Sequence, residues 1–253
     1  MKISIIIPAH NEEEIIEKTI KKTYDVLNKS MYNFEILVVD DNSSDKTGEI
    51  IESLSKTYKN IKPLHKKSKL MGPGGMGSAL RFGFNNCKGD VVIPLMGDLS
   101  DDPNDIPKLV NKILEGYDVV CGSRFLKGSV VTNYPFIKLI CNRLYNKLFA
   151  SLFFLNVQDI SNAFKAYKKE VLLKVGPESK GFEITSEIVL KAHIQKFKIS
   201  EVPVSWRGRD NENESKFGSF NSIRFIIFRL PKIGFSYFKP SLKLWLKFLY
   251  KNL

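Results

Sequence analysis

The sequence has few cysteines and lacks any long uncharged apolar run. Its 253 residues include three cysteines, Cys87, Cys121 and Cys141, which match neither a disulfide framework nor a metal-binding spacing. No segment approaches the roughly 18 uncharged apolar residues that a membrane-spanning helix needs. The apolar N-terminus is interrupted by Pro8 and His10, so we expect no secretory signal peptide. Together these absences favour reduced thiols and a cytoplasmic protein.

Acidic residues are missing from the C-terminal part of the chain. The net charge is +12, and Lys216–Leu253 holds eight Lys or Arg residues and no Asp or Glu. Lys243, Lys247 and Lys251 recur every four residues beside leucines and a tryptophan. Helices with a basic face beside a broad apolar face are typical of membrane interfaces. We therefore interpret 217–253 as basic amphipathic membrane-interface helices, with ordinary core-packing helices as the alternative.

The positive charge of the chain attracts anionic partners in general. Nucleic acid is one of them, but the chain carries none of the motifs of nucleic-acid-binding folds, and its basic segments are rich in Leu, Ile and Phe. We therefore expect no nucleic-acid partner. A phosphate-bearing substrate and the membrane surface remain, and we expect a peripheral location on the inner face of the cell membrane.

The first half of the chain alternates short apolar runs with amphipathic segments. We expect strands at 2–8, 34–39, 61–65, 91–95 and 119–123, and helices at 13–27, 45–57, 76–86 and 105–115. Strands separated by helices of this length imply crossover connections in a mainly parallel sheet. The predicted fold class is therefore α/β, with a Rossmann-like, mainly parallel sheet flanked by helices.

Polar residues follow several of these strands at the point where each strand ends. The strand at 91–95 leads to Asp98, with Ser100, Asp101 and Asp102 close behind. Ligands gather at the carboxyl ends of parallel strands, so Asp98 stands where a carboxylate can hold Mg²⁺ or Mn²⁺ against a diphosphate. For Asp101 and Asp102 we favour a simpler role, as caps of the following helix.

Three motifs carry a resemblance to a known family. They are Pro-Ala-His-Asn-Glu-Glu at 8–13, Val-Val-Asp-Asp-Asn-Ser-Ser-Asp at 38–45 and Gly-Asp-Leu-Ser-Asp-Asp-Pro at 97–103, and together they resemble family 2 glycosyltransferases with a GT-A fold. Later segments are similar to those of polyprenyl-phosphate, or dolichyl-phosphate, mannosyl- and glucosyltransferases; they lie at 122–124, 159–165, 201–209 and 214–216. The resemblance extends over about residues 3–235.

The resemblance implies a GT-A catalytic domain over 1–216, with a nucleotide-binding half at 1–123 and an acceptor half at 124–216. It also implies the residues that contact the nucleotide, which are Pro8, His10, Glu12, Val39, Asp41, Gly97 and Asp98. Asp98 and Ser100 would hold the Mg²⁺ or Mn²⁺ cofactor. Two positions depart from the family pattern, because His10 replaces a Tyr and Met96 replaces the first acid of an Asp-x-Asp motif.

The resemblance further implies cations that meet the phosphates of the substrates. The catalytic residues would be Asp98, Arg124, Arg209 and Lys216. We assign the acceptor phosphate to Arg124, Lys138 and Asn142. For Arg124 the alternative is a pairing with a carboxylate such as Asp159 that only holds a loop.

The chemistry of the acceptor then sets the expected mechanism. A lipid monophosphate is already anionic near neutral pH, so it needs no general base in order to attack. We expect transfer of a hexose from a nucleotide-sugar donor, of the GDP-mannose or UDP-glucose type, to a polyprenyl or dolichyl phosphate, with inversion of the anomeric carbon. Two alternatives stay open: a family 2 glycosyltransferase that acts on a saccharide hydroxyl, and an inactive scaffold that binds nucleotide.

Overall fold

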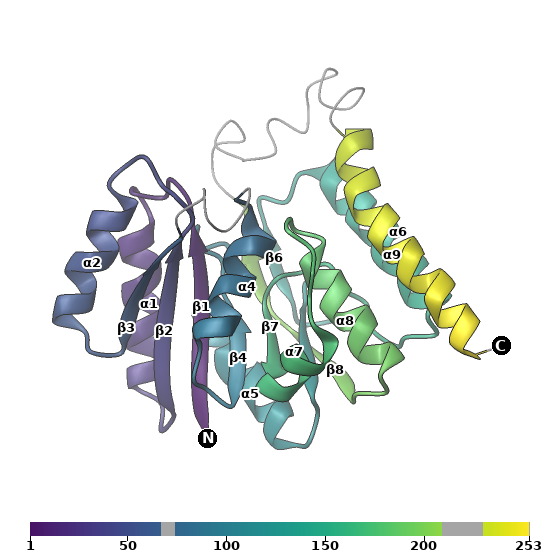
Figure 1. Ribbon diagram of the computed structural model, residues 1–253, viewed down its shortest axis with the longest axis horizontal. Helices are drawn as coiled ribbons and strands as arrows, with labels where there is room; N and C mark the ends of the chain where they lie inside the picture. Colours follow the sequence, from purple (N-terminus) through teal and green to yellow (C-terminus); the bar gives the residue numbers. More distant parts are fainter. Residues whose placement is uncertain (67–73, 209–229, 253) are drawn as a thin grey trace.

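The computed structural model describes residues 1–66, 74–208 and 230–252 (Figure 1). Within these residues the chain forms a seven-stranded sheet in the order β3-β2-β1-β4-β7-β5-β8 and a two-stranded sheet, β6-β9. The strands are β1 (Lys2–Ala9), β2 (Asn33–Asp40), β3 (Ile61–His65), β4 (Val91–Pro94), β5 (Val119–Ser123), β6 (Val130–Thr132), β7 (Lys165–Lys168), β8 (Ile199–Pro203) and β9 (Ser205–Arg207). The helices are α1 (Ile16–Asn28), α2 (Thr47–Thr57), α4 (Met76–Asn86), the 3₁₀ turn η1 (Pro103–Asp105), α5 (Ile106–Leu114), α6 (Phe136–Leu152), α7 (Lys169–Val175), α8 (Ile184–Ile194) and α9 (Leu230–Asn252).

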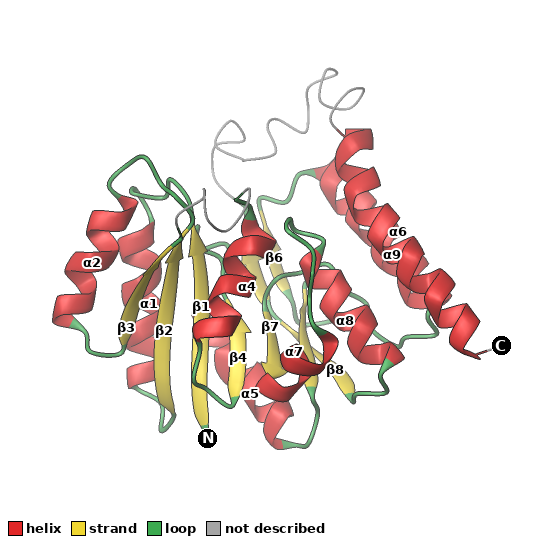
Figure 2. Cartoon of the chain, viewed as in Figure 1, coloured by secondary structure: helices red, strands yellow, loops and turns green. Residues whose placement is uncertain are grey.

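The large sheet is parallel except for β7. Strand β1 pairs in parallel with β2 and β4, β2 pairs with β3, and β5 pairs with β8. Strand β7 runs antiparallel to both of its neighbours, β4 and β5. Helices cover both faces of the sheet (Figure 2). The predicted α/β class with a mainly parallel sheet is confirmed.

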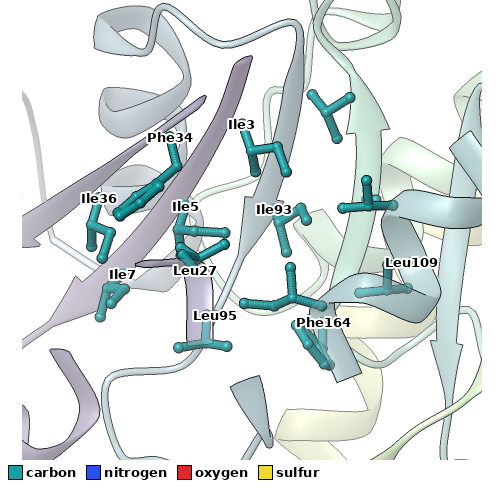
Figure 3. Packing of buried hydrophobic residues seen from close by; sticks show 14 of the residues in the cluster. Ile3, Ile5, Ile7, Leu27, Phe34, Ile36, Ile93, Leu95, Leu109 and Phe164 are labelled. Atoms are coloured by element: carbon teal, nitrogen blue, oxygen red, sulfur yellow. The ribbon is translucent and has the colours of Figure 1, made fainter. Parts of the chain in front are cut away.

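The central strands are mainly apolar because both faces of the sheet are covered. Ile5, Ile6 and Ile7 of β1 are all fully buried. On one face, Ile5 and Ile7 belong to a cluster that includes Leu27 of α1 and Leu109 of α5 (Figure 3). On the other face, Ile6 packs in a second cluster with residues of α4, α6, α7 and α8. Burial on alternating sides explains why β1 is a continuous apolar run instead of an alternating one.

Several predicted element boundaries agree with the structure. The strands expected at 61–65 and 119–123 and the helix expected at 76–86 match β3, β5 and α4. The helix expected from residue 13 begins instead at Ile16. It begins late because the carbonyl of Glu12 accepts hydrogen bonds from the amides of residues 15 and 16, in a turn that precedes the helix.

Asp102 caps η1, as the sequence predicts. Its Oδ1 accepts a hydrogen bond from the amide of Asn104 at 3.1 Å and forms an ion pair with Lys22 Nζ at 3.0 Å. The turn continues directly into α5, which begins with Ile106 and carries a proline in its first turn, where a missing amide donor costs nothing. The helix expected at 105–115 is therefore divided between η1 and α5.

The C-terminal helix α9 packs against α6 and α8. Trp245 Nε1 donates a hydrogen bond to the carbonyl of Leu152 at 3.1 Å, and the hydroxyl oxygens of Ser241 and Tyr145 lie 2.7 Å apart. The core-packing alternative therefore describes one side of this helix. The domain boundary expected at residue 216 lies outside the described residues. Within the described residues, no helix is both long enough and apolar enough to cross a membrane.

Candidate active site

The turn after β4 is clamped onto the end of β1. Thr19 Oγ1 of α1 donates a hydrogen bond to the carbonyl of Gly97 at 2.9 Å. A Cβ on Gly97 would lie 2.8 Å from the carbonyl oxygen of Pro8. Glycine is required here because any side chain would push the turn away from β1. This close approach brings the predicted nucleotide residues Pro8 and Gly97 together and sets Asp98 at the edge of the sheet.

The conformation of this turn determines where Asp98 lies. Leu99 has a φ of 56°, in the left-handed region. The Oδ1 of Asp98 accepts a hydrogen bond from the amide of Ser100 at 3.1 Å, and the carbonyl of Ser100 accepts one from the amide of Arg207 at 2.8 Å. The turn is therefore attached to β1 on one side and to β9 on the other, and the half-buried Asp98 is held at its outer corner.

Asp101 does not cap a helix, so that prediction is wrong. Its side chain is fully buried, and its Oδ2 accepts a hydrogen bond from the amide of Met96 at 3.3 Å. Asp101 forms an antiparallel bridge with Trp206, and in such extended backbone successive side chains point to opposite sides. Asp101 therefore points inward while Asp102 points outward and forms the cap.

Burial gives the Asp101 carboxyl unusual properties. Burial, reinforced by the nearby charge of Asp98, raises the pKa of Asp101 to about 7. Within the described residues, Asp101 Oδ1 is the buried side-chain oxygen that has no hydrogen-bond partner. A buried carboxylate oxygen without a donor is costly. The turn therefore contains a carboxyl group whose ionised form the described protein groups do not fully compensate.

The turn offers a set of donors that fits a hard divalent cation. Asp98 and Ser100 provide oxygen atoms at the sheet edge, and the oxygen of Asp101 without a donor adds to the local negative charge. Within the described part of the chain, no group of three or more His, Cys, Asp or Glu side chains forms a closed metal cage. Mg²⁺ and Mn²⁺ accept such sparse oxygen sites because substrate phosphates supply further ligands.

The predicted nucleotide residues lie at the ends of β1 and β2. His10 Nδ1 lies 2.9 Å from the carbonyl oxygen of Asp41, and the amide of the buried Glu12 donates a hydrogen bond to Thr47 Oγ1 at 2.8 Å. Ala9 and Asp40 are register partners in the sheet, so these two strand ends are side by side. Val39 is fully buried, with β1 on one side and β3 on the other, so the structure does not expose it for contact with a nucleotide.

The carboxylate of Asp41 is already engaged on both oxygens. Oδ1 accepts a hydrogen bond from Lys66 Nζ at 2.7 Å, and Oδ2 accepts one from the amide of Gly75 at 2.7 Å. Lys66 is itself buried. A pair enclosed in this way holds the strand ends in place. Asp41 thus links the end of β2 to the start of α4. Its contact with a nucleotide stays a prediction.

Arg124, directly after β5, forms a two-pronged ion pair with Asp159. Its Nε lies 2.8 Å from Asp159 Oδ2, and its Nη2 lies 3.0 Å from Asp159 Oδ1. Nη1 donates to the hydroxyl of Tyr134 at 3.1 Å, and Nη2 also donates to Ser161 Oγ. Burial would raise the pKa of Asp159, but the charge of Arg124 outweighs it and lowers that pKa. The pairing that the sequence analysis gave as the alternative for Arg124 is therefore present.

Lys138 and Asn142, one turn apart on α6, surround Tyr134. Lys138 Nζ lies 5.6 Å from the centre of the Tyr134 ring and 5.3 Å from that of Trp206, and Asn142 Nδ2 donates to the Tyr134 hydroxyl. Burial, reinforced by the charge of Arg124 and opposed by that of Asp98, lowers the pKa of Lys138 to about 8. The structure thus brings the predicted acceptor cations to the same edge as Asp98.

Sequence reasoning missed the two aromatic rings that organise this cluster. Tyr134 and Trp206 stack at a centroid distance of 4.7 Å, and Tyr134 joins Arg124 to Asn142 through its hydroxyl. Trp206 stood within a motif that carried the resemblance, which was the available signal. The predicted catalytic residues Arg209 and Lys216 lie outside the described residues.

Comparison with known proteins identifies the family of this chain. The family model described as Glycosyl transferase family 2 matches residues 4–176. The chain is 34% identical over 236 residues to a dolichol-phosphate mannosyltransferase of Pyrococcus furiosus, covering 92% of this chain and 64% of that protein. It is 27% identical to a polyprenol monophosphomannose synthase of Mycolicibacterium smegmatis, covering 91% of this chain and 86% of that protein. It therefore spans less than two thirds of the Pyrococcus relative.

A solved structure confirms the GT-A fold. The crystal structure of glucosyl-3-phosphoglycerate synthase from Mycobacterium tuberculosis, in complex with Mn²⁺, UDP-glucose and phosphoglyceric acid, superposes with a TM-score of 0.71. The match covers 96% of this chain and 79% of that one, at 20% identity, which supports a shared fold alone. The family match extends from β1 to α7 and includes the Asp98 turn, Arg124 and Asp159, and so the chain belongs to glycosyl transferase family 2.

Proposed function

We propose that this protein transfers a hexose from a nucleotide-sugar, of the GDP-mannose or UDP-glucose type, to a polyprenyl or dolichyl phosphate. The observation that carries the proposal is the meeting of an acidic turn at Asp98 with the basic cluster of Arg124 and Lys138 on one sheet edge. An acidic turn suits a cation and a diphosphate, whereas a basic cluster suits a second phosphate. The names of the Pyrococcus and Mycolicibacterium relatives support the same substrate classes.

The acidic turn and the basic cluster have different proposed roles in this reaction. Asp98, with Ser100, would hold a Mg²⁺ or Mn²⁺ ion, which when bound neutralises charge on the departing nucleotide diphosphate. Lys138 and Arg124 offset the repulsion between the two anionic substrates as the acceptor phosphate approaches. The phosphate oxygen is already anionic, so no side chain has to remove a proton. Attack opposite the leaving group inverts the anomeric carbon.

We further propose that α6 and α9 bring the protein to the inner face of the membrane. Both helices expose rows of large apolar side chains, which are Phe136, Ile140, Leu144 and Leu148 on α6, and Phe235, Phe238, Leu242, Leu246 and Tyr250 on α9. The two helices lie side by side (Figure 1) and share ring contacts such as Tyr145 with Phe238 at 5.7 Å. Exposed apolar rows of this extent on adjacent helices favour an interaction surface.

The charge on this face and its distance from the site both favour lipid as the partner. Lys239, Lys243 and Lys247 are exposed on α9, and Arg143 and Lys147 are exposed on α6. No acidic residue occurs in either helix. The apolar row of α6 begins at Phe136, two residues from Lys138 of the acceptor cluster. A phosphate carried at the membrane surface would therefore arrive close to Lys138.

A transfer assay with Asp98→Asn tests the chemistry. Purified protein is mixed with radiolabelled GDP-mannose or UDP-glucose, a polyprenyl phosphate and Mn²⁺, and the labelled lipid is extracted. We expect lipid-linked sugar from the wild type, and a loss of two or more orders of magnitude in the variant, because the cation loses its carboxylate. Transfer only to a saccharide hydroxyl would support the second glycosyltransferase reading. Nucleotide binding without transfer to any acceptor would support the scaffold.

Vesicle flotation tests the membrane surface. Replacing Lys243 and Lys247 by Gln should weaken binding to anionic vesicles by about 2 kcal/mol, since each basic residue near such a surface contributes about 1 kcal/mol. Leu242→Asn with Leu246→Asn should weaken it as well. The matched control is Leu114→Asn with Leu173→Asn, which replaces exposed leucines on α5 and α7. Equal flotation of all variants would contradict the proposed surface.

A further inference from the structure

Asp101 has a negative charge with no assigned role in the site. Its side chain is fully enclosed beneath the Asp98 turn, and Oδ1 lacks a hydrogen-bond partner within the described residues. A carboxylate that served only the fold would be expected to have donors on both oxygens. The orphan oxygen therefore points to a positively charged partner that the described residues do not provide.

The nearby cations do not fill that role. Arg124 and Lys165 are close enough for their charges to act on Asp101. Arg124 donates its hydrogen bonds to Asp159, Tyr134 and Ser161, and Lys165 Nζ donates to backbone carbonyls in the segment before β7. Neither cation donates one of these hydrogen bonds to Asp101. Their charges moderate the cost of burying Asp101, but neither supplies a donor to its Oδ1.

The position of Asp101 relative to Met96 suggests what the charge is for. Met96 is apolar and stands where the family pattern has the first acid of the cation motif. The Asp101 carboxylate accepts the amide of this same Met96 at 3.3 Å. The left-handed Leu99 folds the turn back, and its amide donates a hydrogen bond to the carbonyl of Met96 at 3.4 Å, so Asp98 and Asp101 both belong to this one tight turn. A second acid is therefore present at the turn, but it comes from the far end of the turn.

We propose that Asp101 supplies the second negative charge of the divalent-cation site centred on Asp98, in place of the acid that is missing at Met96. The inference rests on the proposed function, because it requires a cation at Asp98. Two neighbouring carboxylates repel each other when the site is empty, and a divalent cation relieves that repulsion when it binds. The bridge to Trp206 fixes Asp101 in the buried position from which its charge acts.

Mn²⁺ binding measured by electron paramagnetic resonance tests this role without any turnover. Free Mn²⁺ is titrated against the full-length protein, with and without UDP or GDP. We expect Asp101→Asn to weaken Mn²⁺ binding by about tenfold or more, as the removal of groups that support metal ligands does elsewhere. The matched control is Asp102→Asn, one residue along. Asp102 is partly exposed and serves as a cap, so its loss should change the affinity by less than about twofold.

A third variant, Asp98→Asn, distinguishes a failure of the proposed role of Asp101 from a failure of the proposed cation site. If Asp98→Asn loses Mn²⁺ while Asp101→Asn binds it like the wild type, the proposed cation site stands and the role of Asp101 is refuted. If none of the three variants alters Mn²⁺ binding, the proposed cation site itself is wrong. Melting curves identify an unfolded variant, and in that event Asp101→Ser, which is smaller and also uncharged, is titrated instead, with the same affinity loss expected.

Discussion

Two carboxylates are buried near opposite ends of the strands of the same sheet, and their surroundings differ. Glu35, near the start of β2, is 1% exposed and accepts hydrogen bonds from Ser4 Oγ at 2.7 Å, Lys2 Nζ at 2.8 Å and Lys62 Nζ at 2.5 Å. Asp101, near the opposite ends of the strands, is 0% exposed and has one oxygen without a donor. Burial would raise both pKa values. The hydrogen bonds lower the pKa of Glu35 to about 2, whereas the pKa of Asp101 rises to about 7.

The difference in hydrogen-bond partners distinguishes the carboxylate of Glu35, which stabilises the fold, from that of Asp101, to which we assign a role in the proposed cation site. At the edge that carries Glu35, the chain supplies every partner, and the carboxylate ties β1, β2 and β3 together. Near Asp101, the described residues leave one carboxyl oxygen without a donor, and in the proposed site a bound cation would compensate its charge. The missing hydrogen-bond partners of a buried carboxylate therefore say more about a binding role than its burial does.

The largest effect is expected from a third buried carboxylate, Asp159, whose partner is Arg124. Arg124→Ala leaves Asp159 enclosed without its cation, so the free energy of unfolding should fall by about 3–5 kcal/mol. Arg124→Lys keeps the charge but loses the two-pronged geometry, and should lose less. Denaturant unfolding measures both.

The same variants test whether Arg124 also meets the acceptor phosphate. In conditions where Arg124→Ala is still folded, transfer to lipid phosphate should fall far more than donor affinity. Parallel losses of stability, donor affinity and transfer would mean that Arg124 only holds the loop through Asp159. Titration of the nucleotide-sugar beside steady-state transfer rates distinguishes the two outcomes.

Glu35→Gln tests the structural role of the Glu35 carboxylate in the comparison with Asp101. The lowered pKa of Glu35 means that its ionised form stabilises the fold, by roughly 3 kcal/mol for a shift from 4.5 to about 2. This stabilisation is present above about pH 4.5 and is lost as the pH falls towards 2. The variant should therefore be less stable at neutral pH and lose less between those two pH values. Unfolding curves at several pH values measure this, and an unchanged pH slope would contradict it.

A double variant tests whether Asp101 replaces the acid at Met96. Met96→Asp added to Asp101→Asn should recover most of the Mn²⁺ affinity, a gain of about tenfold, because the second charge returns to the turn. Met96→Asp alone should gain less, because two carboxylates already repel each other there. Calorimetric titration with Mn²⁺ measures both. A failure to recover affinity would mean that the pocket around Met96 is shaped for an apolar side chain.

The smallest effect is expected in the stability of Asp101→Asn. Removing an uncompensated buried charge should leave the free energy of unfolding unchanged or raise it by up to about 1 kcal/mol at neutral pH. Denaturant unfolding of the cation-free protein measures this. A loss comparable with that of Glu35→Gln would show that Asp101 serves the fold, and the contrast between the two sheet edges would disappear.

Much of the fold was predictable because its signals are local. The apolar runs of β1 to β5 and the helical patterns between them identified the mainly parallel sheet, and the polar residues after those runs identified its functional edge. The antiparallel β7 was not predicted, since its four residues are too few to show a period. The packing of α9 was also open, because a basic amphipathic helix has the same pattern on a core as on a lipid surface.

The site residues that lie within one local sequence motif could be predicted. Asp98 and Gly97 lie in the turn that the motif describes, and Lys138 does approach them from α6. The partnership of Arg124 with Asp159, and the orphan oxygen of Asp101, depend on contacts between distant segments. No local pattern distinguishes Asp101 from its neighbour Asp102, although one is buried and the other is a cap.

The antiparallel β7 has a consequence for how acceptors are chosen. Strands β5 and β7 are hydrogen-bonded neighbours, with Cys121 opposite Lys165, and they run in opposite directions. Residues 124–164 therefore leave the sheet and return to it at the same edge, and they include α6 and the acceptor cluster. In the proposed enzyme, this one excursion carries the residues assigned to the acceptor phosphate, whereas the residues assigned to the nucleotide lie before it in the chain. We expect changes within the excursion to alter the choice of acceptor more than the binding of the donor.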